Sequence, residues 1–132
     1  DFAVEMITTL LANPYSQGYV AERGGKILGS IFVHKFPPSP VAAIGPLTVD
    51  PSAEGGGVGR ALMEAALMEA RKHDYNQVRL IQSPSHLRSF ALYTKCGFTL
   101  REPLFLMRGN PVPSIVGKKH DVRAARSEDI SA

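Results

Sequence analysis

Apolar and polar positions along this chain follow two periods, which predict a mixture of helices and strands. Apolar residues recur at helical spacing in three segments, residues 1–12, 58–73 and 87–95. Runs with the character of β-strands cover five further segments, residues 17–22, 26–36, 41–49, 77–82 and 98–107. Because strands and helices alternate, we expect a layered α/β sheet.

Local signals set the element boundaries. The first helix is expected to end at Asn13-Pro14, and Gly24-Gly25 is a hairpin signal between two strands. Gly45-Pro46 interrupts the 41–49 strand, and proline lacks the N–H that a regular central ladder requires, so we expect a bulge or splay there. The apolar face of the first helix comprises Phe2, Met6, Leu10 and Leu11.

Composition indicates a globular chain with one main core. Its 132 residues, 44% hydrophobic and 20% charged, are enough for a single domain. No apolar run reaches membrane-spanning length, and a net charge of +3 without a long basic cluster does not indicate nucleic acid. The single cysteine excludes an internal disulfide and fits a reducing, cytoplasmic compartment. The chain begins at Asp1 rather than Met, so a preceding segment stays open.

A glycine-rich loop between a strand and a helix is the strongest functional signal. Residues 49–62 read VDPSAEGGGVGRAL. Glycine lets the backbone turn tightly, and the first N–H groups of a helix are free to bind an anion such as a phosphate. A nucleoside-triphosphate loop is excluded because Gly59 is followed by Arg60-Ala61 instead of Lys and Ser or Thr. The dinucleotide fingerprint GxGxxG is also absent.

A second segment, residues 86–98, reads HLRSFALYTKCGF. Together with the loop it resembles the GNAT superfamily of acetyl-CoA-dependent N-acetyltransferases. The family's pyrophosphate loop, Gln/Arg-x-x-Gly-x-Gly/Ala, matches at Gly57 and Gly59, with Glu54 in the first position. The second signature, Asn-x-x-Ala/Ser-x-x-Leu-Tyr-x-Lys-x-Gly-Phe, matches except that His86 replaces Asn; its other positions are Ser89, Leu92, Tyr93, Lys95, Gly97 and Phe98. The resemblance covers residues 17–106.

The resemblance implies a mixed, mostly antiparallel sheet with a splayed central strand pair and helices on both faces. It also implies acetyl-CoA as cofactor, with Tyr93 as the catalytic residue that protonates the coenzyme's sulfur, and no metal. Backbone groups of Leu47 and Val49 would hold the pantetheine arm. The remaining residues expected at the cofactor are Glu54, Gly55, Gly56, Gly57, Val58, Gly59, Arg60, Ala61, His86 and Ser89.

Two features depart from the family pattern. Glu54 places a negative charge near the pyrophosphate, at a cost on the order of 1 kcal/mol if it faces the phosphate. The general base is not identified, because the 41–49 strand contains no carboxylate. His34, Glu22 and Thr48 are the nearby polar candidates, and a water relay or an amine deprotonated in bulk solvent stays equally open.

The function expected from the resemblance is transfer of an acetyl group to a primary amine of a small molecule or peptide, by direct attack of the amine. The alternative is a catalytically degenerate GNAT-like module that binds CoA or regulates, as part of a tandem-domain protein. Intact Tyr93 favours the enzyme, whereas Glu54 and the missing base favour the alternative. Neither nucleic acid nor membrane is expected as a partner.

The tail suggests a more complex organisation. We expect the GNAT domain over residues 1–108, lacking its first strand, followed by a linker over 109–120. Residues 121–132, DVRAARSEDISA, resemble the first strand and helix start of a GNAT domain, with Ser127 as the N-cap. A tandem copy, a permuted domain, a homodimer with strand exchange and a chance match in a polar tail all stay open.

Overall fold

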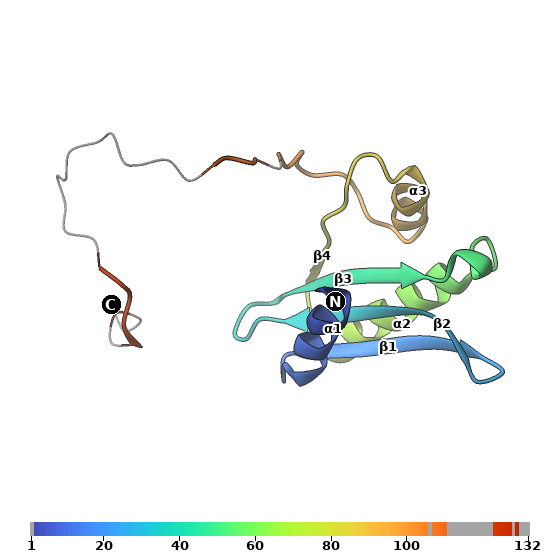
Figure 1. Ribbon diagram of the computed structural model, residues 1–132, viewed down its shortest axis with the longest axis horizontal. Coiled ribbons are helices and arrows are strands. Elements are labelled where there is room, and N and C mark those ends of the chain that lie inside the picture. Colours follow the sequence, from blue (N-terminus) through green and yellow to red (C-terminus); the bar gives the residue numbers. More distant parts are fainter. Residues whose placement is uncertain (1, 106, 111–122, 128, 130–132) are drawn as a thin grey trace. The chain divides into compact units, whose positions relative to one another are not determined.

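The computed structural model describes residues 2–105, 107–110, 123–127 and 129. The chain divides into two units, residues 1–100 and 101–132, which are described separately. Among the described residues, the helices and strands all lie in the first unit (Figure 1). In chain order they are α1 (Phe2–Ala12), β1 (Ser16–Arg23), β2 (Lys26–Lys35), β3 (Val41–Val49), the short 3-10 turn η1 (Pro51–Ala53), α2 (Val58–Lys72), β4 (Gln77–Arg79) and α3 (Leu87–Lys95).

Four strands form one mixed sheet in the order β1-β2-β3-β4. The pairs β1–β2 and β2–β3 are antiparallel, and β3–β4 is parallel. The predicted hairpin turn is confirmed, since Gly24 and Gly25 both adopt positive φ, 58° and 79°, which glycine accepts without a steric cost. β1 and β2 thus form a long antiparallel ribbon, and β3 and β4 follow on the β2 side of it (Figure 1).

The predicted irregularity at Gly45-Pro46 is confirmed as a bulge. Ile31 pairs with Leu47 and Val33 pairs with Ile44, so one β2 residue lies opposite Gly45 and Pro46. Gly45 has φ of 138°, in the region that favours glycine. The bulge bends β3 away from a regular ladder.

β3 and β4 separate shortly after they meet. Only residues 41–43 of β3 pair with residues 77–79 of β4, and the chain leaves the sheet after Arg79. The expected splayed pair is therefore present, and the strand predicted over 77–82 is shorter than expected. The outer side of β3 is open from Ile44 onward within the described sheet.

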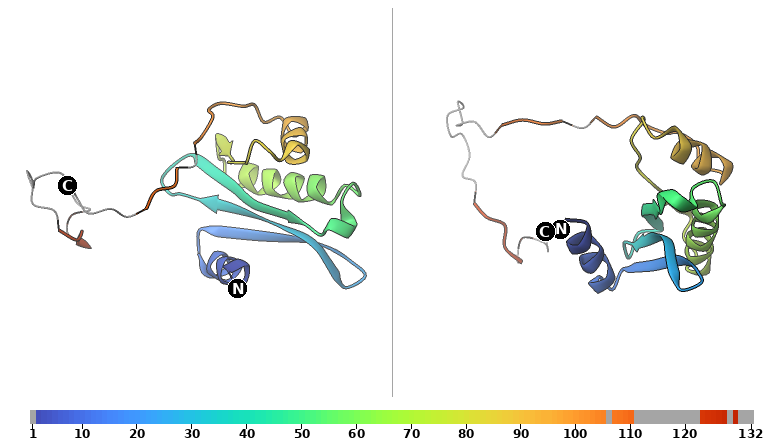
Figure 2. Two further views of the ribbon diagram at one scale, coloured as in Figure 1. Left: turned by 45° about the horizontal axis from the view of Figure 1, so that its top comes forward. Right: turned by 45° about the vertical axis from the view of Figure 1, so that its right-hand side comes forward.

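Helices cover both faces of the sheet, as predicted (Figure 2). The core lies between the sheet and α2. It comprises Ile31, Val33, Ala42, Ile44, Val58, Leu62, Met63 and Ala66, all buried. Burying these side chains supplies most of the hydrophobic stabilisation of the unit.

Helix α1 lies on the opposite face and packs mainly against β1 (Figure 2). Its predicted apolar face is only partly right. Met6 and Leu10 are half-buried together with Ile7, but Leu11 is 69% exposed. The side chain of Phe2 lies outside the described part of the chain.

The strand predicted over residues 98–107 is wrong for the residues the structure describes there. Residues 98–105 and 107 form neither helix nor strand, and Leu100, Leu104, Phe105 and Met107 are exposed. Strand propensity needs a paired neighbour to be expressed, and Pro103 removes one donor. Leu106 lies outside the described residues.

Residues 123–127 and 129 form a turn held by charge. The Arg123 guanidinium donates to both carboxylate oxygens of Asp129, at 2.8 Å each, and Asp129 also accepts from the Arg126 backbone N–H at 2.8 Å. Arg123 and Ala124 are not in a strand. Val122 and Glu128 lie outside the described residues, so a second domain start, the linker and strand exchange stay predictions. Among the described residues no helix is long and apolar enough to cross a membrane.

Candidate cofactor-binding site

The glycine loop is fixed at its start by Asp50. The Asp50 carboxylate accepts hydrogen bonds from the backbone N–H of Ser52 at 2.8 Å and its hydroxyl at 2.6 Å, and pairs with Lys26 at 2.9 Å. These contacts, with the Ser52 hydroxyl bond as the largest cause, lower the pKa of Asp50 to about 2. The loop therefore leaves β3 in one defined direction.

Two glycines in the loop adopt backbone conformations that other residues avoid. Gly55 has φ of 79°, and Gly57, the N-cap of α2, has φ of 82°. A Cβ atom added at Gly57 would meet nothing within 4 Å, so its surroundings are open space at the start of the helix. A hollow of about 190 Å³ borders Gly56, Gly57 and Val58 on the side of the β1–β2 ribbon.

The first turn of α2 presents free backbone donors. The first bond of the helix runs from the N–H of Ala61 to the carbonyl of Gly57, at 3.0 Å. In the described part of the chain, no backbone acceptor lies within reach of the N–H groups of Gly57, Val58, Gly59 and Arg60. Free donors with the positive end of the helix dipole behind them form a seat for a phosphate group.

Two of the predicted loop residues have backbone N–H groups that are already engaged. Gly56 donates to the carbonyl of Ala53 at 3.2 Å, and Ala61 donates within the helix. Gly59 has a packing reason to be glycine, since a Cβ there would lie 3.2 Å from Leu92 and 3.7 Å from Val49. Gly59 thus lets α2 approach α3 and β3 closely, while its own N–H stays free.

The open side of β3 exposes the backbone groups predicted to hold a cofactor arm. The N–H of Asp50 donates to the carbonyl of Leu28 at 2.8 Å, so Asp50 and, two residues earlier, Thr48 direct their backbone groups to β2. By alternation, the N–H and C=O groups of Leu47 and Val49 point away from β2, to the side where β4 has parted. They form an unpaired ladder that a ligand with amide groups can complete.

One buried atom also lacks a partner. Among the described residues, the side-chain oxygen Oε1 of Gln82 is a buried polar atom with no hydrogen bond. Gln82 follows β4 at the point where the strands have separated. These features together fit a long ligand. A phosphate at one end would meet the free N–H groups of α2, and amides along its length would meet the unpaired edge of β3 and the unpaired oxygen of Gln82.

Helix α3 holds the other predicted site residues. Tyr93 is half-buried, packs against the core and meets Phe98 edge-on, with ring centroids 6.2 Å apart. Burial raises the pKa of the Tyr93 phenol, and a hydrogen bond with Ser89 acts in the opposite direction. His86 is the exposed N-cap residue of α3 and makes no side-chain capping bond.

Charged residues around the loop pair with one another. The Arg88 guanidinium of α3 contacts the Glu54 carboxylate, so the acid that departs from the family pattern has a counter-ion. Arg60 pairs with Glu64 one turn along α2 at 2.9 Å, which draws its side chain away from the loop. Sequence reasoning missed the first pair because its members are 34 residues apart.

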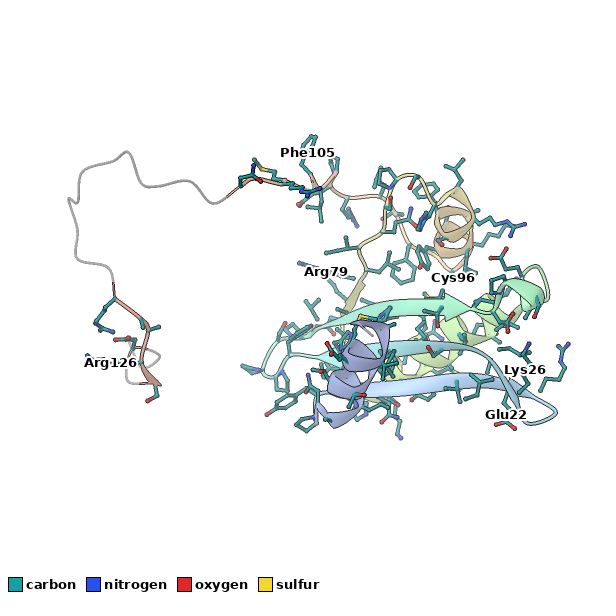
Figure 3. All side chains as sticks on the ribbon, in the orientation of Figure 1. Glu22, Lys26, Arg79, Cys96, Phe105 and Arg126 are labelled. Carbon is teal, nitrogen blue, oxygen red and sulfur yellow. The ribbon has the colours of Figure 1, made fainter. Side chains whose placement is uncertain are left out.

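The candidate bases lie at different places. Glu22 is exposed near the β1–β2 turn beside Lys26 (Figure 3). Thr48 bonds Ser30 at 2.9 Å on an exposed patch. His34 lies at the far end of β2, and its Nε2–H donates to the Gly45 carbonyl, which can only accept. Its other nitrogen, Nδ1, therefore accepts from the Ser16 hydroxyl at 2.8 Å.

A buried ionic cluster that sequence reasoning also missed joins α2 to the sheet. Glu69 is only 8% exposed and accepts hydrogen bonds from Tyr19 at 2.7 Å and Lys35 at 2.9 Å. The Nε2 atom of His73 lies 2.9 Å from the same carboxylate. The Lys35 hydrogen bond is the largest cause that lowers the pKa of Glu69 to about 2, and burial raises the pKa of Tyr19 to about 12. The sequence did hold one signal of this cluster: Glu69 lies three positions after Ala66, on the buried face of α2, where an acid is unusual.

Comparison with known proteins agrees with this geometry. The model of the acetyltransferase (GNAT) family matches residues 2–98. The mycothiol acetyltransferase of Amycolatopsis mediterranei is 33% identical over 91 residues, which are 64% of this chain and 30% of that protein. The chain thus spans about 30% of the length of that relative.

Solved structures share the fold. A putative acetyltransferase from Agrobacterium tumefaciens superposes with a TM-score of 0.68 at 23% identity, covering 81% of this chain and 78% of that one. AAC(6')-Iy, in complex with the bisubstrate analog CoA-S-monomethyl-acetylneamine, gives 0.69 at 19% identity, covering 84% and 81%. The chain belongs to the GNAT acetyltransferase family, which uses acetyl-CoA.

Proposed function

We propose that this chain transfers an acetyl group from acetyl-CoA to a primary amine of a small molecule or peptide. The observation that carries the proposal is the row of free N–H groups from Gly57 to Arg60, next to the unpaired edge of β3. The family membership supplies the acyl donor, and these groups supply a place for its pyrophosphate and its arm. Acetyl-CoA contributes an activated thioester.

Tyr93 is the proposed proton donor to the coenzyme's sulfur. Its raised pKa keeps the phenol protonated at neutral pH, which a general acid requires. Ser89, one turn earlier in α3, lowers the pKa of the phenol and so acts against the effect of burial. The same burial also fits a packing role, so the two roles must be separated by removing the hydroxyl alone.

His34 is the proposed proton acceptor. It lies on the sheet face away from α2, beside the Gly45-Pro46 bulge. In the neutral imidazole whose Nε2–H donates to Gly45, Nδ1 is the atom with a lone pair that can accept a proton. The Ser16 hydroxyl bonded to Nδ1 can pass a proton to it from an amine. Glu22, exposed near the turn, and Thr48, bonded to Ser30, have no such basic atom near the bulge.

The acceptor class rests on similarity. Relatives are named as mycothiol acetyltransferases, and AAC(6')-Iy was solved with an analog joining CoA to acetylneamine. Both names mention a small molecule and not a protein. This chain spans under a third of the length of the mycothiol acetyltransferase. A small-molecule amine is therefore proposed as the substrate of the site described here.

The proposal is tested first by binding. CoA should raise the melting temperature with concentration, since a ligand that binds only the folded state stabilises it. Gly57→Glu should abolish this shift, because a side chain and a negative charge would enter the phosphate seat. Gly25→Glu is the matched control: Gly25 also has positive φ and open surroundings but lies at the β1–β2 turn. No shift of the folded wild-type protein at millimolar CoA would refute the proposal.

Catalysis is tested separately with an amine screen covering aminoglycosides, polyamines, amino acids and peptide N-termini. Release of free CoA that depends on the amine supports the transferase. A protein that binds acetyl-CoA but acetylates none of these amines would favour the alternative, a CoA-binding module without catalysis. The Glu54–Arg88 contact weakens one argument for that alternative, because the misplaced acid is paired.

A further inference from the structure

Gln82 carries an unused hydrogen-bond acceptor in the protein interior. Its Oε1 atom is shielded from solvent and has no donor among the described residues. A buried acceptor without a partner is costly, and most such atoms in folded proteins are satisfied by protein, water or ligand. The position therefore calls for a donor other than the described residues of the chain.

The location of Gln82 shows where that donor must lie. The last paired residue of β4 is Arg79, and Gln82 follows three residues later. Exposure alternates along this stretch: Val78 and Leu80 pack against the core, whereas Ile81 is 80% exposed. Gln82 continues the inward set, so its side chain belongs to the interior side of the segment that has parted from β3.

The opposing strand is also unpaired at this level. Parallel pairing of Ala43 with Arg79 brings the residues after Arg79 alongside the bulge and Leu47. The backbone groups of Leu47 point to that gap. A chain of amides lying in the gap would have the backbone groups of Leu47 on one side and the segment that carries Gln82 on the other.

We propose that the carboxamide oxygen of Gln82 accepts a hydrogen bond from an amide N–H of the cofactor's pantetheine arm. The arm contains two secondary amides, whose N–H groups are the donors that the gap lacks. The inference rests on the proposed function, since it requires the arm to lie along β3. Gln82 is then a binding residue that contacts the pantetheine arm and not the nucleotide.

The test compares two ligands that share a nucleotide. CoA carries the arm, and adenosine 3′,5′-bisphosphate lacks it. Gln82→Met keeps the side-chain length and removes the acceptor. The dissociation constant for CoA should rise about five- to tenfold, as expected for one lost hydrogen bond. Affinity for the bisphosphate should change less than about twofold, because the first turn of α2 is untouched.

A second readout has the opposite sign. Without ligand, Gln82→Met should melt a few degrees higher than wild type, because the orphaned acceptor is gone. Gln77→Met, on the exposed start of β4, is the matched control and should alter neither affinity nor melting temperature appreciably. Should Gln82→Met fail to fold, the side-chain amide resonances of Gln82 in wild type must shift with CoA and stay put with the bisphosphate.

The outcomes separate this inference from the proposed function. If wild type and Gln82→Met bind CoA equally well, the role of Gln82 is overturned and the proposed function stands. Equal weakening of both ligands means a general distortion and also overturns it. Wild type that binds neither ligand refutes the proposed function, and the role of Gln82 falls with it.

Discussion

Replacing Glu69 by Gln tests the electrostatic reasoning most directly, because the change keeps the shape of the side chain and removes its charge. Glu69 is buried under Tyr19, Lys35 and His73. Its pKa falls from 4.5 to about 2, chiefly through the Lys35 hydrogen bond. At about 1.4 kcal/mol per pKa unit, this corresponds to roughly 3 kcal/mol of folding free energy.

Part of that value is lost to solvent, because the side chains of Lys35 and His73 are 19% and 42% exposed. We therefore expect Glu69→Gln to lower the free energy of unfolding at pH 7 by about 2 kcal/mol. For a unit of about 100 residues, the melting temperature should drop by about 10 °C. The sign with pH follows from the lowered pKa of the folded state.

Above about pH 4.5 the carboxylate is ionised in folded and unfolded chains alike, so wild type holds its full advantage. As pH falls from 4.5 toward 2, the unfolded state binds a proton first and the advantage disappears. Urea unfolding of both proteins at pH 7 and pH 3.5 measures this change. The matched control is Glu64→Gln on the same helix, because its pair with Arg60 is exposed and solvent screening leaves it little effect on stability.

The reasoning is refuted if Glu69→Gln and Glu64→Gln are equally stable at pH 7. It is also refuted if the gap between Glu69→Gln and wild type stays constant between pH 7 and pH 3.5. Equal m-values for all three proteins are required, so that the comparison reports stability and not a changed denatured state.

Two further predictions concern the cofactor site. Glu54→Gln should tighten CoA binding by up to about tenfold at low salt, because it removes a negative charge and frees Arg88 for the phosphates, whereas Arg88→Gln should weaken CoA binding. Titrations with CoA at low and high ionic strength test both variants. If both variants bind CoA as wild type does at low salt, neither side chain interacts with the cofactor. Once an amine substrate is known, Tyr93→Phe should lower kcat about 10²–10⁴-fold and leave the affinity for CoA little changed. The control is Tyr75→Phe, which removes the hydroxyl from another half-buried tyrosine that packs against the core. Full turnover by Tyr93→Phe would mean that Tyr93 serves in packing only.

Local signals predicted most of the elements that frame the site. The ranges 41–49 and 87–95 agree with β3 and α3 because proline, glycine and helical periodicity mark their ends. The free donors of α2 could also be foreseen, since every helix leaves its first N–H groups unpaired. Such features depend on neighbours in sequence and need no knowledge of the tertiary fold.

Features that depend on distant partners were not predictable in this way. The segment 98–107 has strand propensity but no strand beside it, so propensity alone misled. The contact between Glu54 and Arg88 and the cluster around Glu69 join residues 34 to 50 positions apart. A one-dimensional pattern shows that a charge is present but not which charge it meets.

The short pairing of β4 with β3 has a consequence for how the protein survives in a cell. Three residue pairs hold β4 to the sheet, so this edge should open more easily than the β1–β2 ribbon, and its amide protons should exchange with solvent sooner. A cofactor arm that occupies the gap would slow that exchange and shield the segment after Arg79 from proteases. The resistance of this edge to opening would then rise with the concentration of acetyl-CoA, because the bound arm would pair with the open side of β3.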